Sequence, residues 1–183
     1  MKVVGFAGSP RIGGNSDTLL DQWLAGAKDA GAEVEKVYLD KLQINPCRAC
    51  DACRRAGASG CIVRDDMQQL YPKLLAADIW VLATPVYFWT PSSQLKLMVD
   101  RWYGMLRHHD LCGKQAALLV SMGDDELKTA QPTIDMFTMA FDYMKMRLLT
   151  PQVVTASKRG EVRDNLEAMQ LAHAAGRSAC PTG

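Results

Sequence analysis

Apolar runs that are typical of strands alternate with amphipathic stretches that are typical of helices along almost the whole chain. The pattern predicts strands at Val3–Ala7, Val34–Leu39, Ile79–Ala83, Ala116–Val120 and Leu148–Thr155. Helical periodicity predicts helices at Thr18–Ala30, Met67–Ala76, Ser93–Tyr103, Leu127–Lys145 and Val162–Gly176. Strands that are mostly apolar throughout and alternate with helices indicate a parallel sheet that is covered on both faces.

These elements predict a three-layer α/β fold of the doubly wound, flavodoxin-like kind, with a five-stranded parallel sheet of order 2-1-3-4-5. We expect a single domain over residues 1–177 and a frayed tail over residues 178–183. Ligands of such folds bind beyond the carboxyl ends of the strands, where the strand order reverses. The first and third strands flank that point, so the loops that follow them are candidate binding loops.

Small and hydroxyl-bearing residues, Gly8–Thr18, lead from the first strand into the first helix. A helix N-terminus offers unpaired N–H groups and a partial positive charge, which together favour an anion. An ordinary turn in which Asn15 or Ser16 caps the helix is the structural alternative. The side chains that can add to an anion site here are Ser9, Arg11, Asn15, Ser16 and Thr18.

The same loop excludes several phosphate-binding motifs. No Gly-Lys-Ser/Thr closes it, which argues against a nucleoside triphosphate with magnesium. The Gly-x-Gly-x-x-Gly of dinucleotide-binding proteins is absent as well. A hydroxyl-lined loop with one arginine suits a terminal monophosphate.

Two further loops follow predicted strands at the same edge. Pro85 is expected to end the third strand, and the aromatic residues Tyr87, Phe88 and Trp89 follow it. Adjacent aromatic side chains in a loop need a partner surface or a flat ligand, or else they pack on the next helix as a hydrophobic staple. The fourth strand runs into Ser121–Asp124, which contains a glycine. Together the loops would suit a planar ring that carries a monophosphate.

At these residues the chain resembles the flavodoxin-like, NAD(P)H-dependent FMN reductases, in the branch that includes the iron–sulfur flavoproteins. The resemblance is carried by Gly8–Arg11, Asn15–Thr18, Thr84–Phe88, Gln94–Lys96, Asp100–Arg101 and the cysteine segment that leads into Asp65–Met67. It implies non-covalent FMN, electron transfer through the flavin, and a homodimer or homotetramer. It also implies that the phosphate and ribityl chain lie on Ser9, Arg11, Asn15, Ser16 and Thr18, and that the ring lies against Pro85, Val86, Tyr87, Phe88, Trp89, Ser121 and Gly123. No side chain is expected to be catalytic, because the flavin carries the chemistry.

Four cysteines lie within fifteen residues, in the spacing Cys47-x2-Cys50-x2-Cys53-x7-Cys61. The Cys-x2-Cys-x2-Cys run is the ferredoxin spacing, which predicts a [4Fe–4S] cluster with Cys61 as the fourth ligand. Zinc is an alternative, although zinc sites normally use two separated Cys-x2-Cys pairs. Free thiols are another. Cys112 is expected to be a buried apolar residue and Cys180 a thiol in the tail.

We expect an FMN-dependent oxidoreductase that passes electrons from NAD(P)H to a small acceptor such as a quinone, a flavin or a metal ion. The alternatives are an iron–sulfur flavoprotein that accepts electrons from ferredoxin, and a non-catalytic four-cysteine metal-binding module. A net charge of +1 gives no electrostatic reason to expect nucleic acid or an anionic membrane as a partner. The chain has no apolar run of membrane-spanning length and no signal peptide, so we expect it in the cytoplasm.

Overall fold

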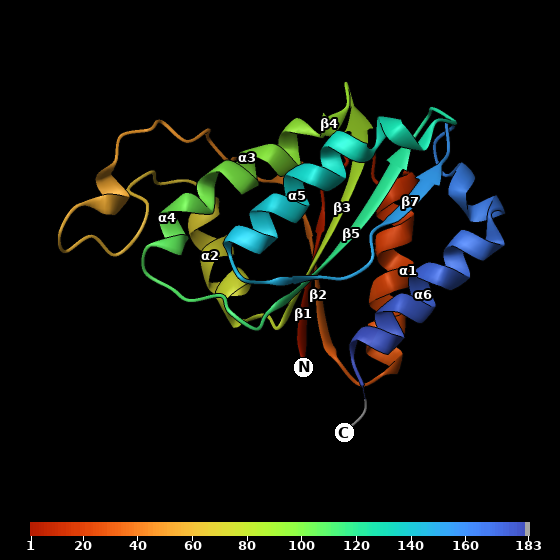
Figure 1. The fold of residues 1–183 in the computed structure, drawn as a ribbon, viewed down its shortest axis with the longest axis horizontal. Coiled ribbons are helices and arrows are strands. Elements are labelled where there is room, and N and C mark those ends of the chain that lie inside the picture. Colours follow the sequence, from red (N-terminus) through yellow and green to blue (C-terminus); the bar gives the residue numbers. More distant parts are fainter. Residues whose placement is uncertain (182–183) are drawn as a thin grey trace.

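A parallel sheet forms the centre of the computed structural model, which describes residues 1–181 (Figure 1). The parallel strands are β1 (Lys2–Ala7), β2 (Glu33–Tyr38), β3 (Ile79–Tyr87), β5 (Gln115–Met122), β6 (Arg147–Leu148) and β7 (Gln152–Thr155). The strands lie in the order β2-β1-β3-β5-β6, with β7 also beside β5. This confirms the predicted flavodoxin-like order, but the sheet has seven strands rather than five.

The two additional strands come from the edge of the sheet and from a hairpin. The segment predicted as one strand, Leu148–Thr155, is divided into β6 and β7, which both pair with β5. Ala116 pairs with Leu148, and Leu119 pairs with Gln152. Between these two pairs the edge segment of β6 and β7 contains one more residue than β5 does. Pro151 lies in this bulge, where a residue without an N–H interrupts the ladder. The seventh strand, β4 (Thr90–Pro91), runs antiparallel to the end of β3.

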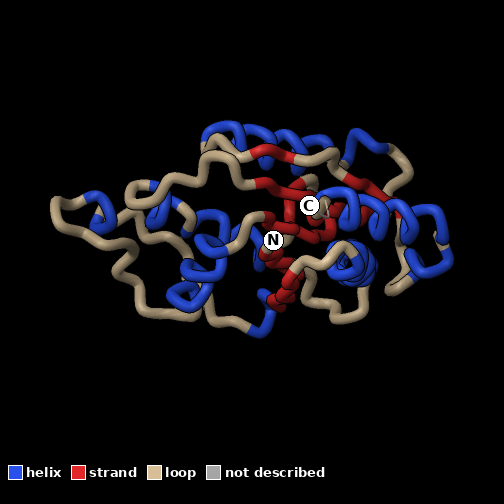
Figure 2. Tube along the Cα trace, turned by 90° about the horizontal axis from the view of Figure 1, so that it is seen from below, coloured by secondary structure: helices blue, strands red, loops and turns tan. Residues whose placement is uncertain are grey.

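Helices cover both faces of the sheet, as the view along the strands in Figure 2 shows. The helices α1 (Asn15–Asp29) and α6 (Leu166–Ala179) lie on one face. The other face is covered by α2 (Met67–Ala76), α3 (Ser93–Arg101), α4 (Tyr103–Leu106) and α5 (Gln131–Tyr143). Short 3-10 turns occur at Leu39–Lys41, Ala52–Arg54, Leu127–Thr129 and Glu161–Asp164.

Each face of the sheet has its own hydrophobic core because successive side chains of a strand point to opposite faces. In β3, Ile79 and Val81 pack against α1, whereas Trp80 and Leu82 belong to the other core. The rings of Trp80 and Trp102 lie 5.3 Å apart in that second core. On the first face, α1 and α6 approach closely at Gly26, where an added Cβ would lie 1.9 Å from the carbonyl oxygen of His173. This contact fixes α1, whose first turn follows the Gly8–Thr18 loop.

The C-terminal region differs from the prediction. Helix α6 begins at Leu166 and continues to Ala179, so the tail starts later than residue 178. Cys180 is buried in the core and Cys112 is exposed, which is the reverse of their predicted roles. Residues 182 and 183, the end of the predicted frayed tail, lie outside the described part of the chain. Among residues 1–181, no helix is long and apolar enough to cross a membrane.

Candidate functional site

The loops after β1, β3 and β5 meet around one cavity of about 140 Å³ at the carboxyl edge of the sheet. Of the predicted site residues, this cavity is lined by Ser9, Arg11, Asn15, Ser16, Pro85, Val86, Tyr87, Ser121 and Gly123. Three predicted residues, Thr18, Phe88 and Trp89, are not part of its lining. The lining also contains Gly14 and Met122, which lie within the predicted loops, and Ala156, Ser157 and Arg159, which were not predicted.

Backbone hydrogen bonds give the loop after β1 its shape. The Gly8 N–H donates to the carbonyl oxygen of Ala83 at 2.8 Å, which joins the start of the loop to β3. The Gly14 N–H donates to the Arg11 carbonyl at 2.8 Å. A Cβ on Gly14 would lie 2.8 Å from the same carbonyl oxygen, which is too close for a larger residue. Gly13 has a φ of +71°, a conformation that glycine adopts without strain. The loop therefore needs small residues at these positions.

The N-terminus of α1 is uncapped. Gly14 occupies the N-cap position, and no side chain accepts a hydrogen bond from the first turn there. The predicted alternative, in which Asn15 or Ser16 caps the helix, is therefore wrong. The hydroxyl of Thr18 is buried without a hydrogen-bond partner among the described residues. Free N–H groups and an unpartnered hydroxyl at one helix end form a place where a polar, anionic ligand is stabilised.

One buried carboxylate lies close to this anion site and is compensated. Asp17 accepts a hydrogen bond from the Gly13 N–H at 2.6 Å and forms an ion pair with Lys36 at 2.7 Å. Burial opposes the charge of Lys36, but the hydrogen bonds to Asp17 and Asp21 outweigh burial and raise its pKa. Within residues 1–181 the guanidinium of Arg11 has no hydrogen-bond or ion-pair partner. Arg11 is therefore a charge that remains available to a ligand.

The segment after β7 contacts the loop after β1 and was missed by sequence reasoning. The side chain of Asn15 donates to the carbonyls of Ala156 and Lys158, at 3.0 and 2.9 Å, and accepts from the Val162 N–H at 3.2 Å. Arg159 donates to the Ile12 carbonyl at 2.5 Å. Asn15 thus holds two loops together. The signal that was available is the position of Arg159, directly after the last predicted strand at the same sheet edge.

An aromatic hairpin forms one side of the cavity. Pro85 was predicted to end the strand, but β3 continues past it. Proline has no N–H to donate, and this is tolerated because β1 no longer pairs with β3 beyond Ala83. Phe88 and Trp89 form the two-residue turn between β3 and β4, with φ of 52° and 66°. Positive φ at both positions is the type I′ geometry, which normally selects asparagine and glycine. Phe88 is 90% exposed and Trp89 52% exposed.

The cysteines lie on a long loop that projects from the molecule beside α3 and α4 (Figure 1). All four, Cys47, Cys50, Cys53 and Cys61, line one cavity of about 190 Å³ together with Arg101, Tyr103 and Gly104. Burial raises the pKa of the Cys53 thiol, and the neighbouring thiolate charges of Cys61, Cys47 and Cys50 raise it further. Among residues 1–181, no three His, Cys, Asp or Glu side chains are gathered closely enough to hold a single metal ion.

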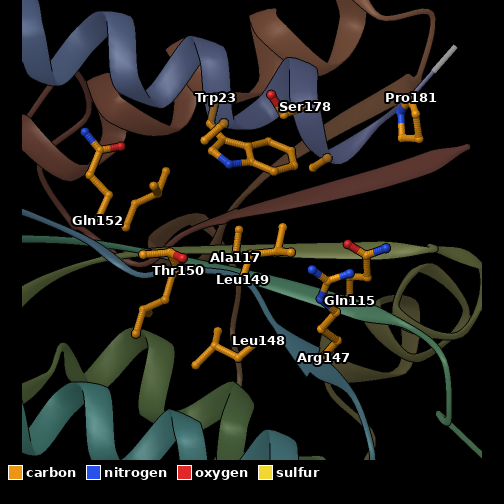
Figure 3. A pocket seen from close by; sticks show the side chains of 14 residues that line it. Trp23, Gln115, Ala117, Arg147, Leu148, Leu149, Thr150, Gln152, Ser178 and Pro181 are labelled. Carbon is orange, nitrogen blue, oxygen red and sulfur yellow. The ribbon is translucent and has the colours of Figure 1, made fainter.

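A larger cavity of about 470 Å³ lies between the sheet and the end of α6 (Figure 3). It shares no lining residue with the cavity at the carboxyl edge or with the cysteine cavity. Gln115 and Arg147, which line it, begin β5 and β6, so this part of its lining lies at the amino ends of the strands. None of the predicted site residues lines it. Ligands of doubly wound folds bind at the opposite edge, which favours the smaller cavity at the carboxyl ends as the functional one.

The sheet order, with an uncapped helix N-terminus beside the strand-order reversal, defines the class of flavodoxin-like proteins. Residues 1–160 match the sequence model of a family described as NADPH-dependent FMN reductase. The chain belongs to this family and is an FMN-dependent oxidoreductase. Its family membership contradicts the alternative of a non-catalytic metal-binding module.

Several known proteins are similar to the chain. An iron–sulfur flavoprotein of Methanosarcina thermophila is 34% identical over 134 residues, which cover 73% of this chain and 69% of that protein. An iron–sulfur flavoprotein of Archaeoglobus fulgidus is 38% identical over 66% of this chain. The matched residues span about half, 54%, of the length of that protein. The solved Trp repressor binding protein of Bacillus subtilis is 26% identical, with a TM-score of 0.70 over 94% of this chain and 98% of that one. A flavone reductase structure shares the fold, with a TM-score of 0.77 at 22% identity over 98% of this chain and 62% of that one.

Proposed function

We propose that FMN binds in the cavity between the loops after β1, β3, β5 and β7, and that the protein passes electrons from NAD(P)H to a small acceptor such as a quinone, a flavin or a metal ion. The observation that carries this proposal is the convergence of nine predicted site residues on that one cavity. The uncapped N-terminus of α1 fits a phosphate group.

The residues divide into those that contact the ligand and those that hold the contacting groups in place. We assign the phosphate to the first N–H groups of α1, with Ser9, Ser16 and Arg11 beside them. Asn15 is a positioning residue, because its amide is already bonded to the segment after β7. When bound, FMN supplies the hydride and electron chemistry.

The ring is expected to lie between the hairpin and the Ser121–Gly123 loop. A cavity of about 140 Å³ is smaller than a typical ligand pocket of roughly 300–1,000 Å³, so the ring must extend beyond it to the surface. Exposed Phe88 and Trp89 present apolar surface of the kind that a partner covers. We therefore propose a homodimer or homotetramer in which a second copy covers this surface.

A titration tests the FMN site. Flavin-free protein should quench the fluorescence of added FMN with one site per chain, and NADH or NADPH should then bleach the flavin absorbance. Re-oxidation by a quinone, by free flavin or by ferric citrate, measured in parallel, ranks the acceptors. Failure to bind FMN at micromolar concentration would contradict the proposal.

A second candidate function is that of an iron–sulfur flavoprotein that receives single electrons from a ferredoxin. The observation that favours it is the shared cavity of Cys47, Cys50, Cys53 and Cys61. A [4Fe–4S] cubane binds each thiolate on a different iron, so its ligands surround a volume and need not converge on one point as they do for zinc. Iron and sulfide analysis after anaerobic reconstitution tests it: about four irons per chain are expected.

A further inference from the structure

One buried arginine joins the two ends of the cysteine loop to the body of the protein. Arg101, at the end of α3, is 1% exposed. Its Nη1 donates to the Asn45 carbonyl at 2.8 Å, just before the first cysteine. Its Nη2 lies 3.4 Å from the Val63 carbonyl, just after the last cysteine. The loop is therefore closed at its base by a single guanidinium group.

Asp65 completes this base. Arg101 donates to both of its carboxylate oxygens, from Nη1 at 2.6 Å and from Nη2 at 3.2 Å. Asp65 also accepts from the Asn45 N–H at 2.8 Å and the Met67 N–H at 3.1 Å. Burial opposes the charge of Asp65, but the hydrogen bond from Arg101 and those from the backbone outweigh burial and lower its pKa. The pair is bidentate and remains charged.

One N–H donor of Arg101 has no acceptor among the described residues. A guanidinium carries five N–H donors, and the four on the Nη atoms have the acceptors just named. Its Nε is buried and has no hydrogen-bond partner among residues 1–181. Folded proteins rarely leave such a donor unpaired. Arg101 also lines the cavity that the four cysteines line, so a group bound there can supply the missing acceptor.

Cys61 lies next to the same arginine. A Cβ added to Gly104 would meet the Cβ of Cys61 at 2.9 Å and the hydroxyl of Tyr71 at 3.3 Å, so the three residues are in close contact. The Tyr71 hydroxyl donates to the Arg101 carbonyl at 3.0 Å. Burial opposes the charge of Arg101, but the hydrogen bond to Asp65 outweighs burial and raises its pKa. Arg101 is thus a permanent positive charge beside one of the predicted ligands.

We propose that Arg101 both positions the cysteine loop and stabilises the reduced form of the [4Fe–4S] cluster that the cysteines bind, with its Nε–H donating to a sulfur atom of the cluster. This inference rests on the iron–sulfur candidate function. Reduction adds one electron to the cluster, and no bond is formed or broken. A positive N–H donor favours the more negative, reduced cluster, so its removal lowers the reduction potential.

The experiment compares anaerobically reconstituted wild-type protein with Arg101→Gln, Arg101→Lys and Asp65→Asn. Each protein is titrated with dithionite, and the reduced cluster is followed by electron paramagnetic resonance. Arg101→Gln should disfavour reduction by about tenfold, which corresponds to about 59 mV for a one-electron couple. Arg101→Lys keeps the positive charge but loses the bidentate guanidinium, so the reduction potential should fall by less than in Arg101→Gln. Asp65→Asn removes the compensating charge and should shift the potential the opposite way.

Arg54→Gln is the matched control, because it removes the same charge from the exposed surface of the same loop and should leave the potential unchanged. FMN content reports whether each variant is folded. An Arg101→Gln protein with a normal cluster and wild-type potential would overturn the proposal. If that variant binds FMN but no iron, the positioning role is supported, and Arg101→Lys and Asp65→Asn then decide the effect on the potential. Wild-type protein that takes up no iron would refute the cluster itself, which is a distinguishable failure.

Discussion

The proposed flavin cavity and the cysteine cavity are held in place by different kinds of structure. The flavin cavity is formed by loops that start where β1, β3 and β5 end. The hydrogen-bond ladder between β1 and β3 extends into the first loop, where the Gly8 N–H donates to the Ala83 carbonyl. The cysteine cavity lies on a loop that leaves the body at Asn45 and depends on one buried ion pair at its base. The first cavity is therefore formed by the fold itself, whereas the second depends on contacts at the base of a projecting loop.

The largest effect is expected where the cysteine loop joins the body. Arg101→Met leaves the Asp65 carboxylate buried and uncompensated, and should lower the free energy of unfolding by about 3–5 kcal/mol. Denaturation by urea measures the change. Lys96→Met, which removes a half-exposed ion pair with Asp100 on the same helix, is the control and should cost about 0–1 kcal/mol. A loss from Arg101→Met no larger than that of the control would contradict the role given to the ion pair.

The flavin site should respond in affinity rather than in stability. Arg11→Ala removes a positive charge from the cavity lining and should weaken FMN binding by about 1.5–3 kcal/mol. Fluorescence titration measures the change, and Arg107→Ala, an exposed arginine outside the cavity lining, is the control. Equal affinity in Arg11→Ala and the wild type would remove Arg11 from the site. Unfolding of flavin-free Arg11→Ala should match that of the wild type.

The hairpin turn beside the flavin cavity allows a test for backbone strain. Phe88 is almost fully exposed and has a positive φ, which costs a residue other than glycine roughly 1–2 kcal/mol. Phe88→Asn should therefore stabilise the flavin-free protein by about 0.5–1 kcal/mol, since asparagine tolerates this conformation better. Phe88→Leu keeps the strain and should give no gain. The two variants are compared by thermal unfolding, and equal midpoints for both would exclude backbone strain as the cause.

Acid should open the cysteine loop while the central strands β1 and β3 stay protected. The pKa of Asp65 is lowered in the folded protein, so its contribution to stability is complete above its ordinary value of 3.8 and is lost as the pH falls below it. We expect faster amide hydrogen exchange in residues 46–64 at pH 3 than the intrinsic pH dependence explains, with no such change in β1 or β3. Uniform protection across the chain at pH 3 would contradict this expectation.

The sequence predicted the sheet order and most of the residues that line the cavity at the carboxyl edge, because both depend on local patterns. Apolar strands identify the sheet, and the rule that ligands bind at the carboxyl ends identifies the loops after them. The same rule applied to the last strand would have found Arg159. The ion pair of Arg101 with Asp65 could not be predicted, because the two residues are 36 positions apart and no periodicity relates them. Cys112 and Cys180 were misplaced because a cysteine is equally compatible with a core and a surface.

The bulge at Pro151 has a consequence for association between molecules. A long, straight edge strand exposes a row of unpaired N–H and C=O groups on which a strand of another chain can assemble. Here the edge is divided into β6 and β7, of two and four residues, and the proline between them cannot donate a hydrogen bond. The interruption makes this edge of the sheet a poor template for a strand of another chain, in contrast to the opposite edge, where β2 runs uninterrupted for six residues.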